Sequence, residues 1–274
     1  MKTTVEKTLV AVAALPIFAG VLSAADSHPI VEVQSGYLFG AIFDGKWIKA
    51  DDTAKQLADE TTYRVYGLTQ PLGEAKGGKA EPEEVPCKET LSVSLIPKPE
   101  KGVIAVAASW NALPRKVQVL DPTQKAYVDA VRAFLKTKGI DEPKVKIDNI
   151  LRVDLDGDGE EEVLISATNY FGKGGQVPMR SPAGSYSMVL LRRVVAGKVE
   201  SQLVEGEFHP KAYVRKEDSF DAPNAYKVIA TLDLDGDGKL EVVVGSNYYE
   251  GEEITIYRCD PKKIEALLSV ACGA

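Results

Sequence analysis

The sequence predicts a mainly β fold with an α/β N-terminal part, and three observations lead to this prediction. One acidic loop occurs twice in the C-terminal half, and each copy is followed by a run rich in β-branched residues. The clearest helical pattern lies before both copies. We therefore expect an N-terminal region over residues 26–143 and a β-repeat region over residues 144–274.

Residues 1–25 have the features of a signal peptide. Lys2 and Lys7 flank the start of an apolar stretch from Leu9 to Leu22, and Ser23-Ala24-Ala25 fits a small-residue cleavage site. The stretch is too short to span a bilayer comfortably, and no later apolar run is long enough to do so. We expect an exported protein, periplasmic or extracellular, with no membrane span after signal cleavage.

The composition of the mature chain is acidic. Without residues 1–25 it has 31 basic and 39 acidic side chains, a net charge of −8. Nucleic-acid binding requires a basic face, so the charge does not favour a nucleic-acid partner.

The three cysteines are Cys87, Cys259 and Cys272. Export permits a disulfide, and an odd number leaves at least one thiol unpaired. Pairing of Cys272 with Cys87, pairing of Cys272 with Cys259, and three buried thiols all remain open at this stage.

The N-terminal region has the pattern of strands with one short helix. The predicted elements are a hairpin over residues 37–48 that turns at Asp44-Gly45, a short helix over 51–59, and strands over 62–68, 91–96 and 103–108. Residues 73–86 are rich in Gly, Pro and charge, which predicts a mobile loop.

A longer helix is predicted to begin at Asp121. Asp121 is a good N-cap, and Pro122 suits the first helical position. One apolar stripe follows at helical spacing, formed by Tyr127, Val131, Phe134 and Leu135. Gly139 is expected to end the helix, and the stripe is expected to pack on a sheet.

The acidic loops have the composition of cation sites. Each has carboxylates at relative positions 1, 3, 5 and 9 and glycines at positions 4 and 6. Carboxylates this close repel one another unless a cation lies among them, and Ca²⁺ prefers six to eight oxygen ligands. No Cys or His lies in either loop, which argues against Zn²⁺. The expected side-chain ligands are Asp154, Asp156, Asp158 and Glu162 in one loop and Asp233, Asp235, Asp237 and Glu241 in the other, with the backbone carbonyls of Glu160 and Lys239.

An EF-hand begins with a similar pattern, but it requires a bidentate glutamate at position 12 and a helix on each side. Position 12 is Ile165 in the first loop and Val244 in the second. The flanking residues are those of strands. We therefore expect two strand–loop–strand turns.

The similarity extends beyond the loops into two repeats, at about 144–206 and 225–274. Each reads as about four strands, which is the size of one blade of a β-propeller. Two blades do not close a ring. A partial or degenerate propeller and a two-layer α+β arrangement are both consistent with the sequence.

The pattern D-x-D-G-D-G-x-x-E before an apolar strand resembles the calcium loop of FG-GAP/VCBS-type repeats. This resemblance covers the C-terminal half and implies the same acidic ligands at positions 1, 3, 5 and 9. Position 9 is often Asp in that family, whereas here it is Glu162 and Glu241. More of the chain resembles exported bacterial proteins. This second resemblance does not indicate any particular activity.

The sequence favours a non-catalytic module that interacts with a protein or glycan. Its two histidines are His28 and His209, and no motif of a known catalytic site surrounds either. A hydrolase with dispersed acids and a purely structural calcium-stabilised protein are the alternatives. Tyr170, Phe171, Tyr248 and Tyr249 either form a binding rim with the loop 172–184, which contains Lys173, Met179 and Arg180, or pack between the blades, and we favour packing for the tyrosines.

Overall fold

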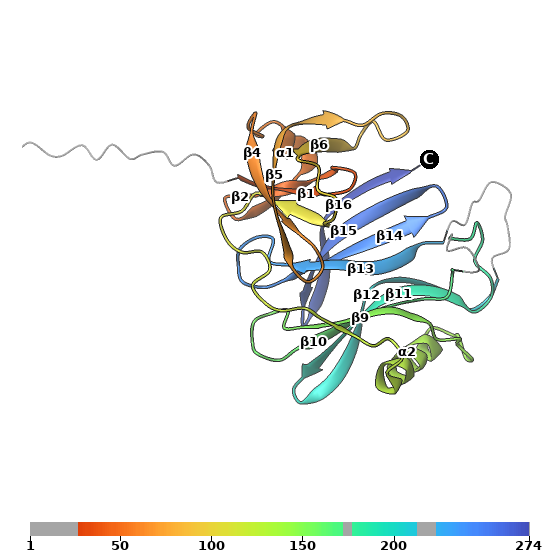
Figure 1. Cartoon of the computed structure of the whole chain (residues 1–274). Coiled ribbons are helices and arrows are strands. Elements are labelled where there is room, and N and C mark those ends of the chain that lie inside the picture. The colour runs from red at the N-terminus through yellow and green to blue at the C-terminus, as the bar shows by residue number, and fades with distance from the viewer. Residues whose placement is uncertain (1–26, 172–176, 213–222, 274) are drawn as a thin grey trace, which may run out of the picture.

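A computed structural model describes residues 27–171, 177–212 and 223–273, so the expected signal peptide lies outside the described residues. The described chain is mainly β, with three antiparallel sheets and two helices (Figure 1). Neither of these helices is long and apolar enough to cross a membrane.

The N-terminal sheet has the strand order β3-β2-β1-β7-β4-β5-β6. Every pairing in it is antiparallel, and a five-residue helix, α1 (Ala50–Ala54), connects β3 to β4. The predicted hairpin is confirmed, because Asp44 and Gly45 both have positive φ (47° and 71°) at its turn. The strands are β1 (Ser27–Glu32), β2 (Leu38–Phe43), β3 (Lys46–Lys49), β4 (Thr61–Tyr66), β5 (Pro71–Pro82), β6 (Leu91–Ile96) and β7 (Ile104–Val106).

The prediction of a mobile loop over residues 73–86 is wrong, because most of this segment is β5, paired with β4 and β6. The reason is close packing at Gly77. A Cβ atom at this position would lie 2.6 Å from Val93 Cγ1 and 2.9 Å from Tyr63 Cε2. The glycine therefore allows a large side chain to pack against the strand, which composition alone does not distinguish from a loop signal.

The two repeats form two further sheets, each with four consecutive antiparallel strands. We call the sheet of the first repeat the outer sheet and that of the second the middle sheet. The outer sheet contains β9 (Ile147–Val153), β10 (Glu162–Thr168), β11 (Ser185–Val195) and β12 (Lys198–His209), with β8 (Gln118–Leu120) added beside β9. The middle sheet contains β13 (Ala225–Leu232), β14 (Glu241–Tyr248), β15 (Gly251–Asp260) and β16 (Lys263–Gly273).

Helix α2 (Lys125–Thr137) begins later than the sequence predicts. Asp121 does not cap it, because its Oδ1 accepts hydrogen bonds from the backbone N–H and the hydroxyl of Thr123 (2.8 and 2.7 Å). The predicted end is confirmed. Gly139 has φ 82°, its N–H donates to Lys136 O (3.1 Å), and Ile140 N donates to Leu135 O (3.2 Å).

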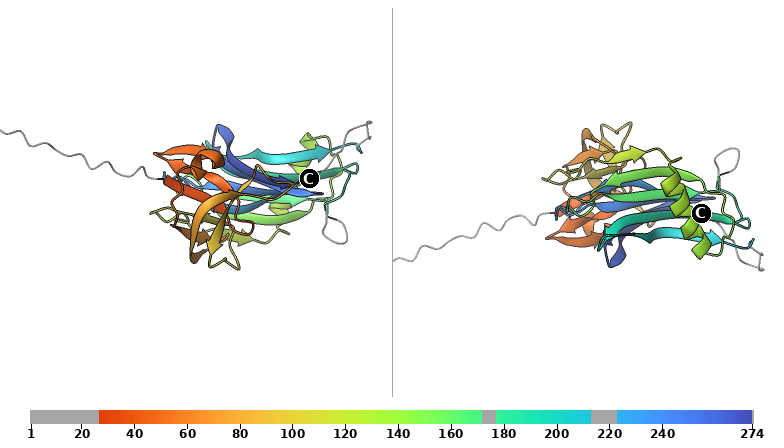
Figure 2. Two further views of the ribbon diagram at one scale, coloured as in Figure 1. Left: turned by 90° about the horizontal axis from the view of Figure 1, so that it is seen from above. Right: turned by 90° about the horizontal axis from the view of Figure 1, so that it is seen from below.

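The three sheets and α2 are stacked in layers, with the middle sheet between the other two (Figure 1). Alternate residues of β14 show the arrangement: Val243 packs with the N-terminal sheet, whereas Val242 and Val244 pack with the outer sheet. Val131 and Leu135 of α2 are buried against the far face of the outer sheet, as predicted (Figure 2). β8 and α2 therefore belong with β9–β12, although they precede the expected boundary at residue 143.

Two features join the layers. A disulfide connects Cys87, just before β6, with Cys272 in β16, and leaves Cys259 as a buried thiol. The edge strand β13 has two backbone N–H groups that donate to outer-sheet hydroxyls, Tyr226 N to Ser187 Oγ (2.8 Å) and Val228 N to Ser166 Oγ (3.0 Å).

Candidate metal-binding loops

The two acidic loops connect equivalent strands, the first loop (residues 154–162) between β9 and β10 and the second (233–241) between β13 and β14. The expected strand–loop–strand context is thus confirmed. Position 12 of each loop, Ile165 and Val244, is buried in the hydrophobic core. Neither residue can serve as the last ligand of an EF-hand.

The aspartate at position 1 holds both loop glycines. In the first loop Asp154 accepts from Gly157 N (2.6 Å) and Gly159 N (3.2 Å). In the second, Asp233 accepts from Gly236 N (2.7 Å) and Gly238 N (3.2 Å). All four glycines have φ between 77° and 92°, a region that other residues rarely adopt, so the glycines are required by the backbone.

The remaining acids repeat the same hydrogen bonds. Position 3 accepts from the N–H of position 5 (3.4 and 3.3 Å), and position 5 accepts from the N–H of position 7 (2.8 Å in both loops). The glutamate at position 9 accepts from the N–H of position 2 (2.8 and 3.0 Å). The two copies of the loop therefore share one backbone conformation, in which N–H groups fix each carboxylate.

Three carboxylates converge in each loop, with one oxygen from each lying within 4.8 Å of the others. They are Asp154, Asp156 and Glu162 in the first loop, and Asp233, Asp235 and Asp237 in the second. Of the predicted side-chain ligands, Asp158 and Glu241 lie outside these two groups. Glu160 and Lys239, expected to contribute carbonyls, donate their N–H groups to Asp158 and Asp237.

The second loop is the more buried of the two. Burial, followed by repulsion from Asp235, raises the pKa of Glu241 to about 8. Burial also raises the pKa values of Asp233 and Asp235, and that of Glu162 in the first loop. A bound cation would favour the ionised form of each group, so these carboxylates are poised to gain from a positive ion.

An arginine on the third strand of each repeat faces the position-9 glutamate, a feature that sequence reasoning missed. The last register pairs beside the loops are Val163 with Arg192 and Val242 with Tyr257, so Arg193 and Arg258 follow directly at the loop ends of their strands. Arg258 forms an ion pair with Asp235 and lies 3.6 Å from Glu241 Oε1. Arg193 instead donates to Cys259 O (2.6 Å). The second loop therefore contains its own positive charge.

The segment that follows β7 holds the second loop in place. Trp110 Nε1 donates to Asp233 O (2.8 Å), and Asp233 N donates to Ala112 O (2.8 Å). The Trp110 ring covers Gly236, where a Cβ atom would lie 3.1 Å from it. The N-terminal region thus contacts the loop directly.

Two of the tyrosines considered for a binding rim, Tyr170 and Tyr248, pack within the protein instead, as favoured from the sequence. Tyr170 is buried, with its hydroxyl donating to Glu207 Oε1 (2.5 Å). Tyr248 packs over Gly251 and Gly273 of its own sheet. Met179 and Tyr249 are exposed, Arg180 is also at the surface, and Lys173 lies outside the described residues.

The two histidines lie in different surroundings. His28 Nδ1 is hydrogen-bonded to Ala107 O (2.9 Å) and its ring lies edge-on to Trp110. His209 Nε2 lies 3.6 Å from Glu207.

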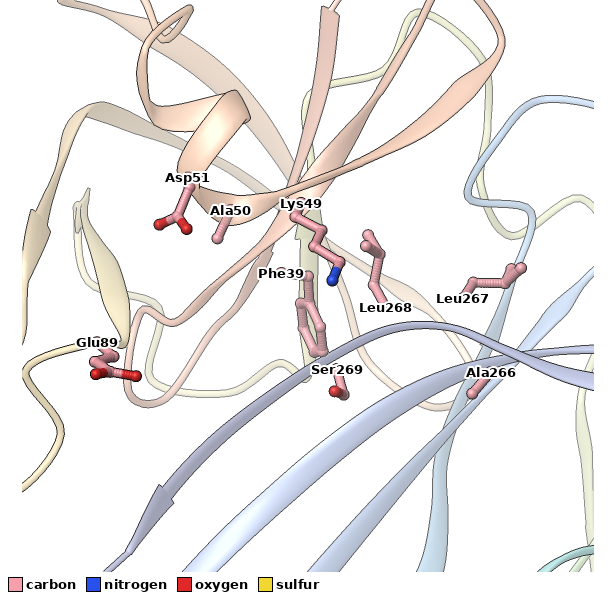
Figure 3. Close-up of a pocket in the computed structure, with 9 residues that line it drawn as sticks. All are labelled: Phe39, Lys49, Ala50, Asp51, Glu89, Ala266, Leu267, Leu268 and Ser269. Atoms are coloured by element: carbon pink, nitrogen blue, oxygen red, sulfur yellow. The ribbon is translucent and has the colours of Figure 1, made fainter.

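A hollow of about 490 Å³ lies between the N-terminal sheet and β16. Figure 3 shows Lys49 reaching toward the Phe39 ring, with Asp51 and Glu89 to one side and β16 residues along the other. Among the described residues Lys49 makes no ion pair with either acid, so the hollow presents both charges to solvent, whereas the Phe39 ring is buried in the core.

A scan against models of protein families finds no match, and searches of curated proteins and of solved structures find none either.

Proposed function

We propose that this chain is an exported, calcium-stabilised, β-rich module without catalytic activity, in which each acidic loop holds one Ca²⁺. The observation that carries the proposal is the repeated hydrogen-bond pattern of the two loops, in which corresponding distances agree within 0.2 Å. Backbone N–H groups fix each carboxylate and so bring oxygens together, and hard oxygen ligands suit Ca²⁺.

The same loops and their four-stranded sheets support a relation to FG-GAP/VCBS-type repeats. In this proposal the two sheets correspond to two consecutive blades, stacked face to face through one apolar core. The N-terminal sheet takes the place of a third blade against the middle sheet.

Calcium should act mainly through stability. With Kd about 0.1 mM and about 1 mM Ca²⁺, one site adds roughly 1.4 kcal/mol. For a chain of this size that corresponds to a Tm increase of roughly 3–6 °C for each site.

The test is thermal unfolding of residues 26–274 in Ca²⁺ and in chelator, for the parent and for Asp156→Ala and Asp235→Ala. We expect each substitution to lower Tm more in Ca²⁺ than in chelator, and Asp235→Ala to retain part of its loss in chelator because Arg258 then lacks its ion-pair partner. Asp129→Ala is the matched control, because Asp129 lies on α2 and pairs with Arg132 (2.6 Å). Equal losses in both conditions would refute a metal-ligand role.

We further propose that the module binds a protein or glycan, and that the hollow beside β16 is the contact surface. A recess bordered by exposed side chains of both charges can contact the polar groups of either partner. Binding to a panel of glycans and peptides should be weakened by Lys49→Glu and unaffected by Lys125→Glu on α2. Turnover of a glycoside or ester substrate, abolished by replacing one acid outside the loops, would favour the hydrolase instead. A chain that binds only calcium would be purely structural.

A further inference from the structure

The two acidic loops lie next to each other and share one arginine. Arg115, between β7 and β8, donates from Nε to Asp154 O (2.6 Å) and from Nη2 to Leu155 O (3.2 Å) in the first loop. The same Nη2 donates to Gly238 O (2.6 Å) in the second loop. The loops also touch directly, through Leu240 N and Leu155 O (2.7 Å).

Arg115 binds backbone rather than acid. Although Arg115 lies between two acidic loops, no carboxylate of the described residues lies within ion-pair distance of its guanidinium. Its planar fork is instead fixed by three carbonyl oxygens in two loops. Through these hydrogen bonds, Arg115 links the position of one loop's backbone to that of the other, and it does not neutralise a loop carboxylate directly.

The carbonyls that hold Arg115 are close to the first ligand of each loop. Asp154 is itself position 1 of the first loop. In the second, Gly238 accepts from Arg115 through its carbonyl and donates through its N–H to Asp233 (3.2 Å). A shift of either aspartate therefore moves a carbonyl that the arginine holds.

We propose that Arg115 couples the two cation sites, so that Ca²⁺ in one loop raises the affinity of the other. The inference rests on the proposed calcium function. The first ion orders its own loop and, through Arg115, the neighbouring one. The second ion then binds a loop that has already lost conformational freedom, which lowers the entropic penalty of binding.

Repulsion between the two ions acts in the opposite direction. The loops lie at the surface, where salt screens charge over about 8 Å at physiological ionic strength. Hydrogen bonds to carbonyls are not screened in this way. Raising the salt concentration should therefore preserve or increase the coupling, whereas a coupling of purely electrostatic origin would weaken.

The second loop has a built-in reporter, because Trp110 covers Gly236 and donates to Asp233. The chain has two tryptophans, so Trp47→Phe leaves Trp110 as the single emitter. Trp47 approaches Asp235 of the second loop, so calorimetry first compares the Ca²⁺ affinity of Trp47→Phe with that of the parent, and all later factors are taken within the Trp47→Phe background. Ca²⁺ titration followed by Trp110 fluorescence then measures the second loop. Calorimetric titration of Asp235→Asn measures the first loop with the second disabled.

In the Trp47→Phe background we expect Asp156→Asn, which disables the first loop, to raise the Kd of the second at least about fivefold. Thermodynamic linkage requires the Kd of the first loop to rise by the same factor when the second loop is disabled. Arg115→Met keeps the aliphatic stem and removes the donors, and should reduce the factor to within about twofold. Arg132→Met, on the distant helix α2, is the matched control and should leave it unchanged.

Two Kd values that do not depend on the other loop would overturn the coupling and leave the calcium function intact. An unchanged factor in Arg115→Met would also overturn the role of Arg115. If the parent takes up no Ca²⁺ at about 5 mM, above the range for extracellular modules, both proposals fail. If Arg115→Met does not fold, Arg115→Lys retains the charge without the fork and should lose most of the coupling.

Discussion

At the scale of single residues, Arg258 is a positive charge that the second loop already contains. It pairs with Asp235 and lies near Glu241, whose side chain is 1 % exposed. Removing it leaves the largely buried Asp235 carboxylate without its ion-pair partner when no cation is bound.

We therefore expect Arg258→Met to lower Tm by roughly 3–8 °C in chelator, corresponding to about 1–3 kcal/mol. In saturating Ca²⁺ the loss should be much smaller, since the ion replaces the missing charge. Differential scanning calorimetry in both buffers measures this. A loss that is as large in Ca²⁺ as in chelator would contradict the explanation.

Glu241 predicts an unusual pH dependence. Its folded-state pKa of about 8 lies above the ordinary value of 4.5, so between these values the folded chain holds a proton that the unfolded chain releases. Stability contributed by this group is present below pH 4.5 and is lost as the pH rises toward 8. In chelator, Tm should therefore fall between pH 5.5 and about 8.5, by an amount that Glu241→Gln reduces. A flat Tm in the parent would count against this environment for Glu241.

The loop ligands could be predicted from sequence because their spacing is local. Carboxylates at alternate positions and two glycines are visible within nine residues. Arg115, Trp110 and Arg258 could not be found in this way. Arg258 reaches the loop through strand register, and the other two approach from a segment more than 100 residues away.

At the scale of elements, the local sequence pattern predicted the structure correctly where burial of apolar side chains determines the conformation. The strands after each loop and the apolar stripe of α2 were predicted correctly, because each has a single face or a fully buried run. The local pattern gave a wrong prediction where a contact outside the pattern determines the role of a residue. Gly77 packs against Tyr63 and Val93 in a strand, and Asp121 forms a turn with Thr123 instead of capping α2.

At the scale of the whole molecule, the layers are joined covalently at one point. Cys87 and Cys272 are separated by 185 residues, and the loop they close constrains the unfolded chain. The sequence offered two pairings for Cys272 and could not choose, because the choice depends on how β16 packs against the N-terminal sheet.

Cys272→Ser should lower Tm by roughly 5–10 °C, from a typical disulfide contribution of about 2–4 kcal/mol. Reductant should bring the parent to the same Tm and leave the variant unaffected. The increase in Tm caused by Ca²⁺ should persist in both, since the loops lie elsewhere. A reductant-insensitive parent would argue that these cysteines are not paired in solution.

The serine hydroxyls that accept hydrogen bonds from the edge strand β13 affect how readily this edge can pair with a strand of another molecule. An exposed strand edge is a template onto which a foreign strand can add, and this is a common route to aggregation. Ser166 and Ser187 occupy two of the N–H groups that such a strand would need. Two small side chains on a neighbouring sheet thus protect the β13 edge of the middle sheet against polymerisation.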